Sequence, residues 1–229
     1  MKTLSDYNRE KFASLETDLR ESRLKKAARL IGEEPPGVLL DIGCGNGEFS
    51  ARFLPLGFRV CGIDLTEAPV EIARAKGLDA RRHDLASGPL PYDSGVFDVV
   101  FAGEVIEHLV DTTSFLRDIH RVLRPAGCAI ITTPNLASFE NRMRLLFGVF
   151  PAWVEYKLEG GQGHVRSYTP ATLRMHLHET GFRVERHLGN WVPFVPQRYA
   201  DDVRMPLLAK TGDWFPSLAM DIIMKARRT

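Results

Sequence analysis

Short apolar runs alternate with amphipathic stretches along the middle of the chain. The runs are apolar throughout, which is typical of parallel strands buried on both faces, and the stretches between them repeat apolar residues at helical spacing. We therefore predict an α/β fold with a doubly wound, mostly parallel sheet and helices on both faces. The expected strands are 38–42, 59–64, 79–83, 97–102, 128–133, 182–188 and 218–226, and the expected helices are 46–56, 67–76, 112–123 and 170–180.

Three segments fall outside this alternation. Residues 5–31 place apolar side chains, among them Leu15, at near-helical spacing and should form one or two amphipathic helices that cap the domain. Residues 135–168 are too many for a plain crossover and are expected to form a lid over the ligand end of the sheet. Residues 189–215, rich in Trp, Pro and Phe, make a second excursion before the last strand.

Composition and charge narrow this picture. The 229 residues, 44% hydrophobic and 26% charged, suit one soluble domain, divided into a cap (1–34), a ligand-binding core (36–134), the lid and a C-terminal half (169–229). The net charge of +1 offers no overall field that would attract nucleic acid or an anionic membrane. We expect neither a signal peptide nor a segment that spans a bilayer. The three cysteines lack metal-type spacing, so we expect reduced thiols and a cytoplasmic protein.

A glycine-rich turn follows the first predicted strand, in the stretch LLDIGCGNGEFS (39–50). Such a turn places a ligand over a helix N-terminus in many nucleotide-binding folds. Its glycines stand at every second position, which fits neither the dinucleotide pattern nor a P-loop. Asp41 and Glu48 ring the turn with negative charge, which disfavours a pyrophosphate and favours a cationic ligand. S-adenosylmethionine, which joins a sulfonium and an ammonium to an adenosine, is the expected cofactor.

Two further acidic residues lie where an adenosine site would need them. Asp64 ends the second predicted strand, about 20 residues beyond the turn, where a carboxylate can accept both ribose hydroxyls. Asp84 follows the third predicted strand and is expected to face the adenine amino group, with Leu85 against the ring.

Five stretches, in order, resemble the motifs of class I S-adenosylmethionine-dependent methyltransferases of the type 11/23 group: VLLDIGCGNGEFS, GIDLT, HDLA, FDVVFAGEVIEHLVD and RVLRPAGCAIITTPN. The resemblance covers residues 36–135 and implies a Rossmann-like, seven-stranded sheet with a reversed last strand. It also implies an enzyme that consumes S-adenosylmethionine and releases S-adenosylhomocysteine. The positions it suggests as cofactor-lining are Asp41, Gly43, Cys44, Gly45, Asn46, Asp64, Leu65, Asp84, Leu85 and Glu104.

Candidate catalytic residues follow the fourth predicted strand in the stretch GEVIEHLVD, which places Glu104, Glu107 and His108 at the carboxyl edge of the sheet. His108 is the first candidate for a general base, and His164, where the lid returns to the sheet, is the second. Glutamates and histidines together also suit a divalent metal ion. The pattern resembles the E-x-x-E-H of small-RNA 2'-O-methyltransferases, where a metal binds the ribose hydroxyls, and of ubiquinone-biosynthesis O-methyltransferases. The sequence leaves the use of a metal open.

Three functions remain open at this point. The first is O-methylation of a hydroxyl on a small organic acceptor, such as a natural product, a quinone precursor or a sugar. The second is metal-assisted RNA 2'-O-methylation, against which the near-zero net charge and the lack of a basic domain argue. The third is a non-catalytic, cofactor-binding scaffold. The lid stretch FENRMRLLFGVFPAWV carries Arg142 and Arg144 beside an apolar stripe, so peripheral lipid contact stays open, as does the choice between monomer and homodimer.

Overall fold

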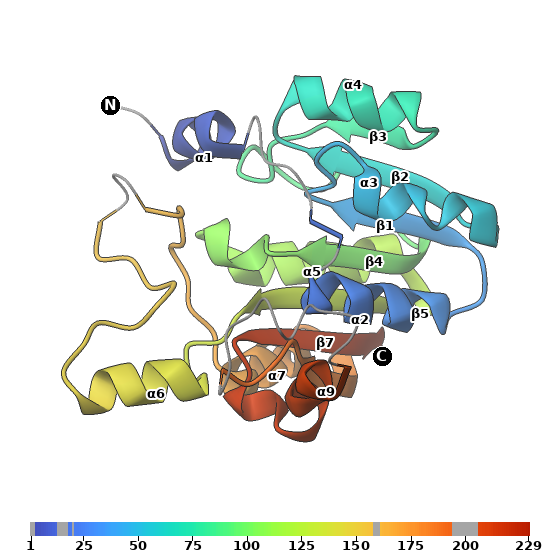
Figure 1. The fold of residues 1–229 in the computed structure, drawn as a ribbon. Coiled ribbons are helices and arrows are strands. Elements are labelled where there is room, and N and C mark those ends of the chain that lie inside the picture. Colours follow the sequence, from blue (N-terminus) through green and yellow to red (C-terminus); the bar gives the residue numbers. More distant parts are fainter. Residues whose placement is uncertain (1–2, 13–17, 20, 158–160, 194–205) are drawn as a thin grey trace.

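A seven-stranded sheet forms the centre of the molecule, in the order β3-β2-β1-β4-β5-β7-β6 (Figure 1). β7 runs antiparallel to its neighbours β5 and β6, and the other neighbouring strands pair in parallel. This confirms the doubly wound sheet and the reversed last strand. The structure is a computed structural model, and it describes residues 3–12, 18–19, 21–157, 161–193 and 206–229.

The strands follow the predicted order closely. They are β1 (Val38–Ile42), β2 (Arg59–Asp64), β3 (Asp79–Arg82), β4 (Phe97–Gly103), β5 (Leu123–Pro134), β6 (Phe182–Gly189) and β7 (Asp221–Arg228).

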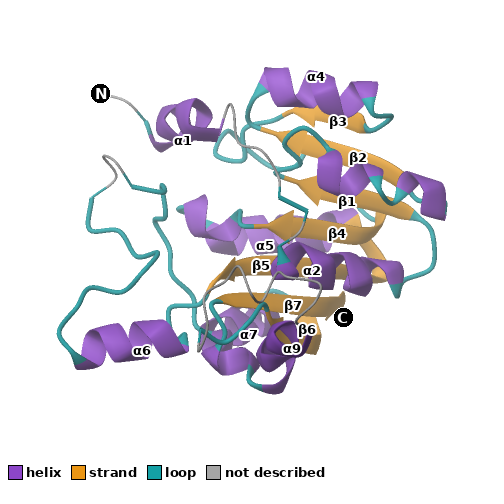
Figure 2. Ribbon diagram, in the orientation of Figure 1, coloured by secondary structure: helices purple, strands orange, loops and turns teal. Residues whose placement is uncertain are grey.

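Helices cover both faces of the sheet (Figure 2). On one face, α2 (Ser22–Gly32), α3 (Glu48–Ala51) and α4 (Glu67–Ala75) contribute to one buried apolar cluster, and on the other, α5 (Thr112–Val122) and α7 (Pro170–Glu179) contribute to a second. Neighbouring strand residues alternate between the two clusters. In β1, for example, Leu39 belongs to the first cluster, whereas Leu40 and Ile42 belong to the second. Burial on both faces explains why the strands are apolar throughout.

Two helices lie apart from these layers. α1 (Leu4–Phe12) and α6 (Phe139–Leu146) lie on the left of Figure 1, beyond the arrowheads of β1 and β4. α9 (Pro206–Trp214) precedes β7. The described residues also form the short 3-10 helices η1 (Leu54–Leu56), η2 (Ile106–His108) and η3 (Pro216–Leu218). None of the helices in the described part of the chain is long and apolar enough to cross a bilayer.

Several predicted boundaries are wrong for local reasons. The helix predicted over 46–56 ends at Ala51 as α3, because Pro55 has no N–H for the Ala51 carbonyl and its ring would clash there. The last strand begins at Asp221 instead of residue 218, since η3 occupies the residues before it. β5 begins at Leu123, so the strand predicted over 128–133 is too short.

The segment after β5 begins with a short helix. α6 ends at Leu146, and Gly148 follows in the left-handed region at φ 70°. The predicted helical position Leu15 and the stretch 194–205 of the second excursion lie outside the described residues.

Candidate active site

The glycine turn joins β1 to α3 through three residues in the left-handed region. Gly43, Gly45 and Gly47 have φ angles of 76°, 51° and 72°, which residues with a side chain rarely adopt. A Cβ atom on Gly43 would also come within 2.9 Å of the Val105 side chain. The backbone N–H of Gly45 donates a hydrogen bond of 2.9 Å to Asp64 at the end of β2. The backbone of the turn therefore requires this glycine spacing.

Two carboxyl groups lie beneath the turn. Asp41 is 3% exposed and accepts a hydrogen bond from the Ser50 hydroxyl. Burial raises the pKa of Asp41 to about 7; the Ser50 hydrogen bond opposes this rise and the charge of Asp64 adds to it. Burial also raises the pKa of Asp64, which accepts a further backbone hydrogen bond from Thr66 at 3.0 Å. A cation bound nearby would favour the ionised form of both groups.

Cys44, within the turn, is a packing residue. Its side chain is buried, and a Cβ atom on Gly62 of β2 would come within 2.7 Å of its sulfur. Burial raises the pKa of the Cys44 thiol above its ordinary value, so the thiol stays protonated and is a poor nucleophile.

A cavity of about 1900 Å³ opens along the carboxyl ends of β1 to β4. Open α/β sheets bind ligands at this edge, where the strand order reverses, and here it reverses between β1 and β4. The cavity is larger than the roughly 300–1,000 Å³ of most small-molecule sites, so it has room for a cofactor and an acceptor. The predicted residues that line it are Asp41, Gly43, Cys44, Gly45, Asp64, Leu65, Asp84, Leu85, Glu104, His108 and His164.

Three residues singled out in the sequence are not part of the lining. Asn46 accepts a hydrogen bond from the backbone N–H of Glu48 at 3.0 Å and so supports the start of α3. Glu48 is exposed in the first turn of that helix, so the negative charge at the turn comes from Asp41 and Asp64 instead. Glu107 lies behind the lining, and its surroundings are described below.

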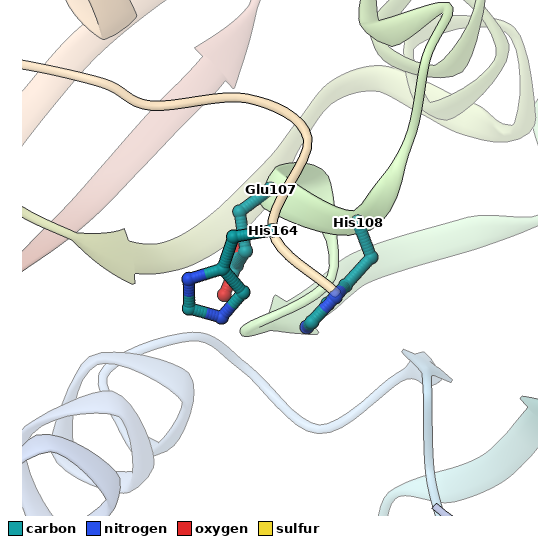
Figure 3. A group of neighbouring side chains, drawn as sticks. All are labelled: Glu107, His108 and His164. Carbon is teal, nitrogen blue, oxygen red and sulfur yellow. The ribbon is translucent and has the colours of Figure 1, made fainter. Parts of the chain in front are cut away.

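Glu107, His108 and His164 meet just beyond the carboxyl end of β4 (Figure 3). The first two belong to η2, and His164 belongs to the loop that returns from α6 to α7. One potential ligand atom from each residue lies within 4.8 Å of those of the other two. The imidazole centroids are 4.9 Å apart. Glu104 is outside this group and accepts a hydrogen bond from the Thr132 hydroxyl at 2.9 Å.

Backbone carbonyl groups orient both imidazoles. The Nδ1 atom of His108 lies 3.1 Å from the carbonyl oxygen of Gly163, and that of His164 lies 2.9 Å from the carbonyl oxygen of Trp153. Because a carbonyl oxygen only accepts hydrogen bonds, each Nδ1 carries a proton. In the neutral ring the lone pair is then on Nε2, the atom that can accept a proton or bind a metal.

Glu107 is an unusual buried acid. Its side chain is 1% exposed, and Oε2 accepts a hydrogen bond from the Thr133 hydroxyl at 2.9 Å. No hydrogen-bond donor for Oε1 is present among the described residues. Burial raises the pKa of Glu107 well above its ordinary value, and the charge of Glu104 adds to the rise. A buried carboxyl oxygen without a donor is costly, and protonation of the group or a bound cation would lower that cost.

Arg23 is a cavity residue that the sequence analysis missed. It lies on α2 with 15% of its side chain exposed, and its Nη1 atom donates to the Thr132 hydroxyl at 3.3 Å. The same atom lies 3.8 Å from Glu104 Oε1. In the sequence, Arg23 is one basic residue of an amphipathic helix, where the usual prediction is a solvated side chain, so the pattern carried no signal for it.

Relatives of known family match this chain over most of its length. A family model described as a methyltransferase domain matches residues 12–187. A ubiquinone biosynthesis O-methyltransferase of Pseudomonas aeruginosa is 31% identical over 202 residues, which cover 84% of this chain and 84% of that protein. A protein of Mycolicibacterium smegmatis, described as a probable S-adenosylmethionine-dependent methyltransferase, is 36% identical over 153 residues. That match covers 66% of this chain and about half, 54%, of the relative.

Solved structures agree on the fold. A crystal structure of an S-adenosylmethionine-dependent methyltransferase from Mesorhizobium loti superposes with a TM-score of 0.62 at 22% identity, over 89% of this chain and 96% of that one. The matches favour an enzyme over a non-catalytic scaffold. The cavity at the switch point, the glycine turn with its acidic residues and the match of the family model agree, and the chain belongs to the class I S-adenosylmethionine-dependent methyltransferases.

Proposed function

We propose that this methyltransferase acts on a hydroxyl group of a small organic acceptor. The observation that carries the proposal is the pair of carbonyl-oriented imidazoles, His108 and His164, at the cavity. A hydroxyl must lose its proton when its oxygen is methylated, so this transfer needs a general base. Methylation of an amine or of an activated carbon depends less on a base. The name of the Pseudomonas relative, a ubiquinone biosynthesis O-methyltransferase, supports the same kind of transfer.

The cofactor would lie across the carboxyl ends of β1 to β4. In this arrangement Asp64 accepts the ribose hydroxyls, and Asp84 and Leu85 face the adenine. Asp41 balances the positive charge of the methionine end. Arg23, which also lines the cavity, would pair with the cofactor carboxylate. The placement rests on the lining of the cavity and on the chemical parts of S-adenosylmethionine.

Methyl transfer from a sulfonium is an in-line displacement. The acceptor oxygen forms a bond to the methyl carbon while the carbon–sulfur bond breaks, and the sulfonium becomes the neutral thioether of S-adenosylhomocysteine. The acceptor proton passes to Nε2 of His108 or of His164. The protein contributes mainly by holding the acceptor oxygen in line behind the methyl group and by excluding water.

Two segments would enclose the reaction, residues 1–34 as a cap and residues 135–168 as a lid. In α1, the Ser5 hydroxyl donates to Asp84 at 2.5 Å, and the Tyr7 hydroxyl donates to the Gly161 carbonyl at 2.7 Å. Gly163 lies beside Asn8 of α1, because a Cβ atom there would meet its Oδ1 at 2.6 Å. α1 thus contacts the adenine side of the cavity and the loop that carries His164, as expected of elements that close over a ligand.

A divalent metal ion is a second candidate at the same site, favoured by Glu107 Oε1, for which the described part of the chain supplies no hydrogen-bond donor. Glu107, His108 and His164 would hold it through a carboxylate and two imidazoles, a donor set that several divalent ions accept. Metal-bound histidines usually donate their other N–H to a carbonyl, as both imidazoles do here. Such an ion would lower the pKa of an acceptor hydroxyl. A metal site of this kind also suits the ribose hydroxyls of an RNA, although a net charge of +1 gives that acceptor little support.

The two histidines can be tested by single substitutions. The variants are His108→Ala and His164→Ala. In the variant that removes the base, transfer of a labelled methyl group from S-adenosylmethionine into a metabolite extract should fall by about 100-fold or more. Binding of S-adenosylhomocysteine, measured by calorimetry, should persist. His178→Ala, at an exposed position of α7, is the matched control and should behave as the wild type. Full turnover in both cavity variants would contradict the proposal.

Chelation separates the two versions of the site. If turnover survives extensive treatment with EDTA, an imidazole base is sufficient. If turnover is lost and returns with added Mg²⁺ or Mn²⁺, the three residues hold a metal ion, and Glu107→Gln should then weaken metal binding as well as turnover.

A further inference from the structure

The last turn of α6 and the segment after it expose several large apolar side chains, which we call the apolar ridge (residues 145–156). Its exposed fractions lie between 48% and 80%. Soluble proteins rarely expose apolar residues in such a row, whereas single exposed residues such as Leu56 and Ile72 are ordinary. The exposed members of the ridge are Leu145, Leu146, Phe147, Val149, Phe150, Trp153 and Tyr156.

The ridge is held in shape by polar contacts behind it. The Ser138 hydroxyl caps α6 by accepting from the Asn141 backbone N–H at 3.2 Å. The buried Asn141 side chain accepts from the Ala152 N–H at 2.7 Å and donates to the Ala152 carbonyl at 3.3 Å. These bonds tie the far end of the loop back to the helix. The apolar side chains therefore project from an organised loop.

The charges around the ridge favour an anionic partner. Its two acidic neighbours are engaged within the protein: Glu140 pairs with Arg144 at 2.8 Å, and Glu155 accepts hydrogen bonds from the backbone N–H groups of Gln162 and Gly163. Arg142 and Lys157 are exposed at the two ends of the ridge. Residues 139–157 carry three basic and two acidic side chains, a net charge of +1.

We propose that the apolar ridge docks onto a lipid bilayer that carries anionic headgroups. Leucine and phenylalanine side chains would enter the boundary between headgroups and acyl chains, where Trp and Tyr are also favoured. Arg142 and Lys157 would meet the headgroups, each adding to the attraction. The low net charge of the whole chain leaves this attraction local to the ridge.

The ridge is also part of the cavity wall, because Ala152 and Trp153 line the cavity and the Trp153 carbonyl orients His164. An acceptor dissolved in the bilayer would thus reach the site along the docked segment. This consequence rests on the proposed function, whereas the docking does not.

Vesicle flotation tests the docking without any measure of turnover. The full chain should float with phosphatidylcholine vesicles that contain about 30 mol% phosphatidylglycerol, and less with phosphatidylcholine alone. In the double variant Leu146→Glu, Phe147→Glu, binding should fall by about tenfold or more, because two carboxylates would have to enter the interface. Arg142→Glu should weaken binding to the anionic vesicles selectively. Ile72→Glu is the control, because it also places a charge at an exposed apolar position, but on α4. This variant should bind as the wild type does.

Failure of the wild type to float with anionic vesicles at low salt would overturn the proposal, as would equal flotation of the double variant. An unchanged thermal shift with S-adenosylhomocysteine would show that the double variant is folded. Sedimentation velocity adds a further outcome. If the wild type is a dimer and the double variant a monomer, and neither binds vesicles, the ridge is a contact between two copies of this chain and the lipid assignment is wrong.

Discussion

Asp41 interrupts the apolar residues of β1 with a carboxyl group that water scarcely reaches. Its pKa is raised from 3.8 to about 7 by burial, so the folded state holds this proton more tightly than the unfolded chain does. The stability that the proton provides is complete below about pH 4 and is lost as the pH rises to about 7. A cationic ligand beside Asp41 would offset this loss at neutral pH.

The Asp41→Asn variant tests this linkage. Between about pH 5 and about pH 7, the free energy of unfolding of the ligand-free wild type should fall by about 2 kcal/mol more than that of the variant. Urea unfolding at several pH values measures the difference. Asp93→Asn, at an exposed position, should follow the wild-type curve. Parallel curves for Asp41→Asn and the wild type would contradict the raised pKa.

Among single residues, the sequence predicts the position of those that lie at the ends of strands. Asp41, Asp64, Gly43 and Gly45 are fixed by local order along the chain, and they line the cavity as that order indicated. Arg23 and the burial of Glu107 could not be predicted, because both depend on contacts with Thr132 and Thr133 of β5, more than 20 residues away in sequence. Such contacts leave no periodic signal.

The glycine turn is an element whose conformation sets the start of α3. Gly47 has a φ of 72°, and a Cβ atom there would lie 2.9 Å from Ala73 Cβ and 3.1 Å from its Cα on α4. Gly47→Ala should therefore lower the free energy of unfolding by about 2–4 kcal/mol through backbone strain and overpacking. Gly32 lies at the end of α2, and a Cβ atom there would lie in open space. Gly32→Ala should therefore change the free energy of unfolding by about 1 kcal/mol or less. Equal urea midpoints for the two variants would refute this reading of the turn.

Element types were easier to predict than element ends. The central strands could be predicted because they are buried on both faces of the sheet and are therefore apolar along their length. The stretches between them show helical spacing. The ends depend on single residues such as Pro55, which stops the helix at Ala51, and Pro216, which begins η3 before β7. The ridge after α6 was visible as an apolar stripe, but its exposure depends on the loop geometry that Asn141 imposes.

The whole molecule combines a shared half with an individual one. The strands β1 to β4 and their loops carry the residues that we predict to line the cofactor, and all of these but Asn46 line the cavity. The segment after β5 also contributes to the cavity wall, and we propose that the acceptor binds on its side, near His164. The sequence predicts the first half from ordered motifs, whereas the acceptor depends on how these separate segments meet around His108 and His164.

The most direct test of the account is to follow a labelled methyl group from S-adenosylmethionine into an extract of the source cells, fractionated into RNA, protein, lipid and small molecules. The account predicts label in the small-molecule or lipid fraction, as a methyl ether, and its loss when the base histidine is replaced by alanine. Label in RNA or in protein, or label that does not depend on either histidine, would contradict it.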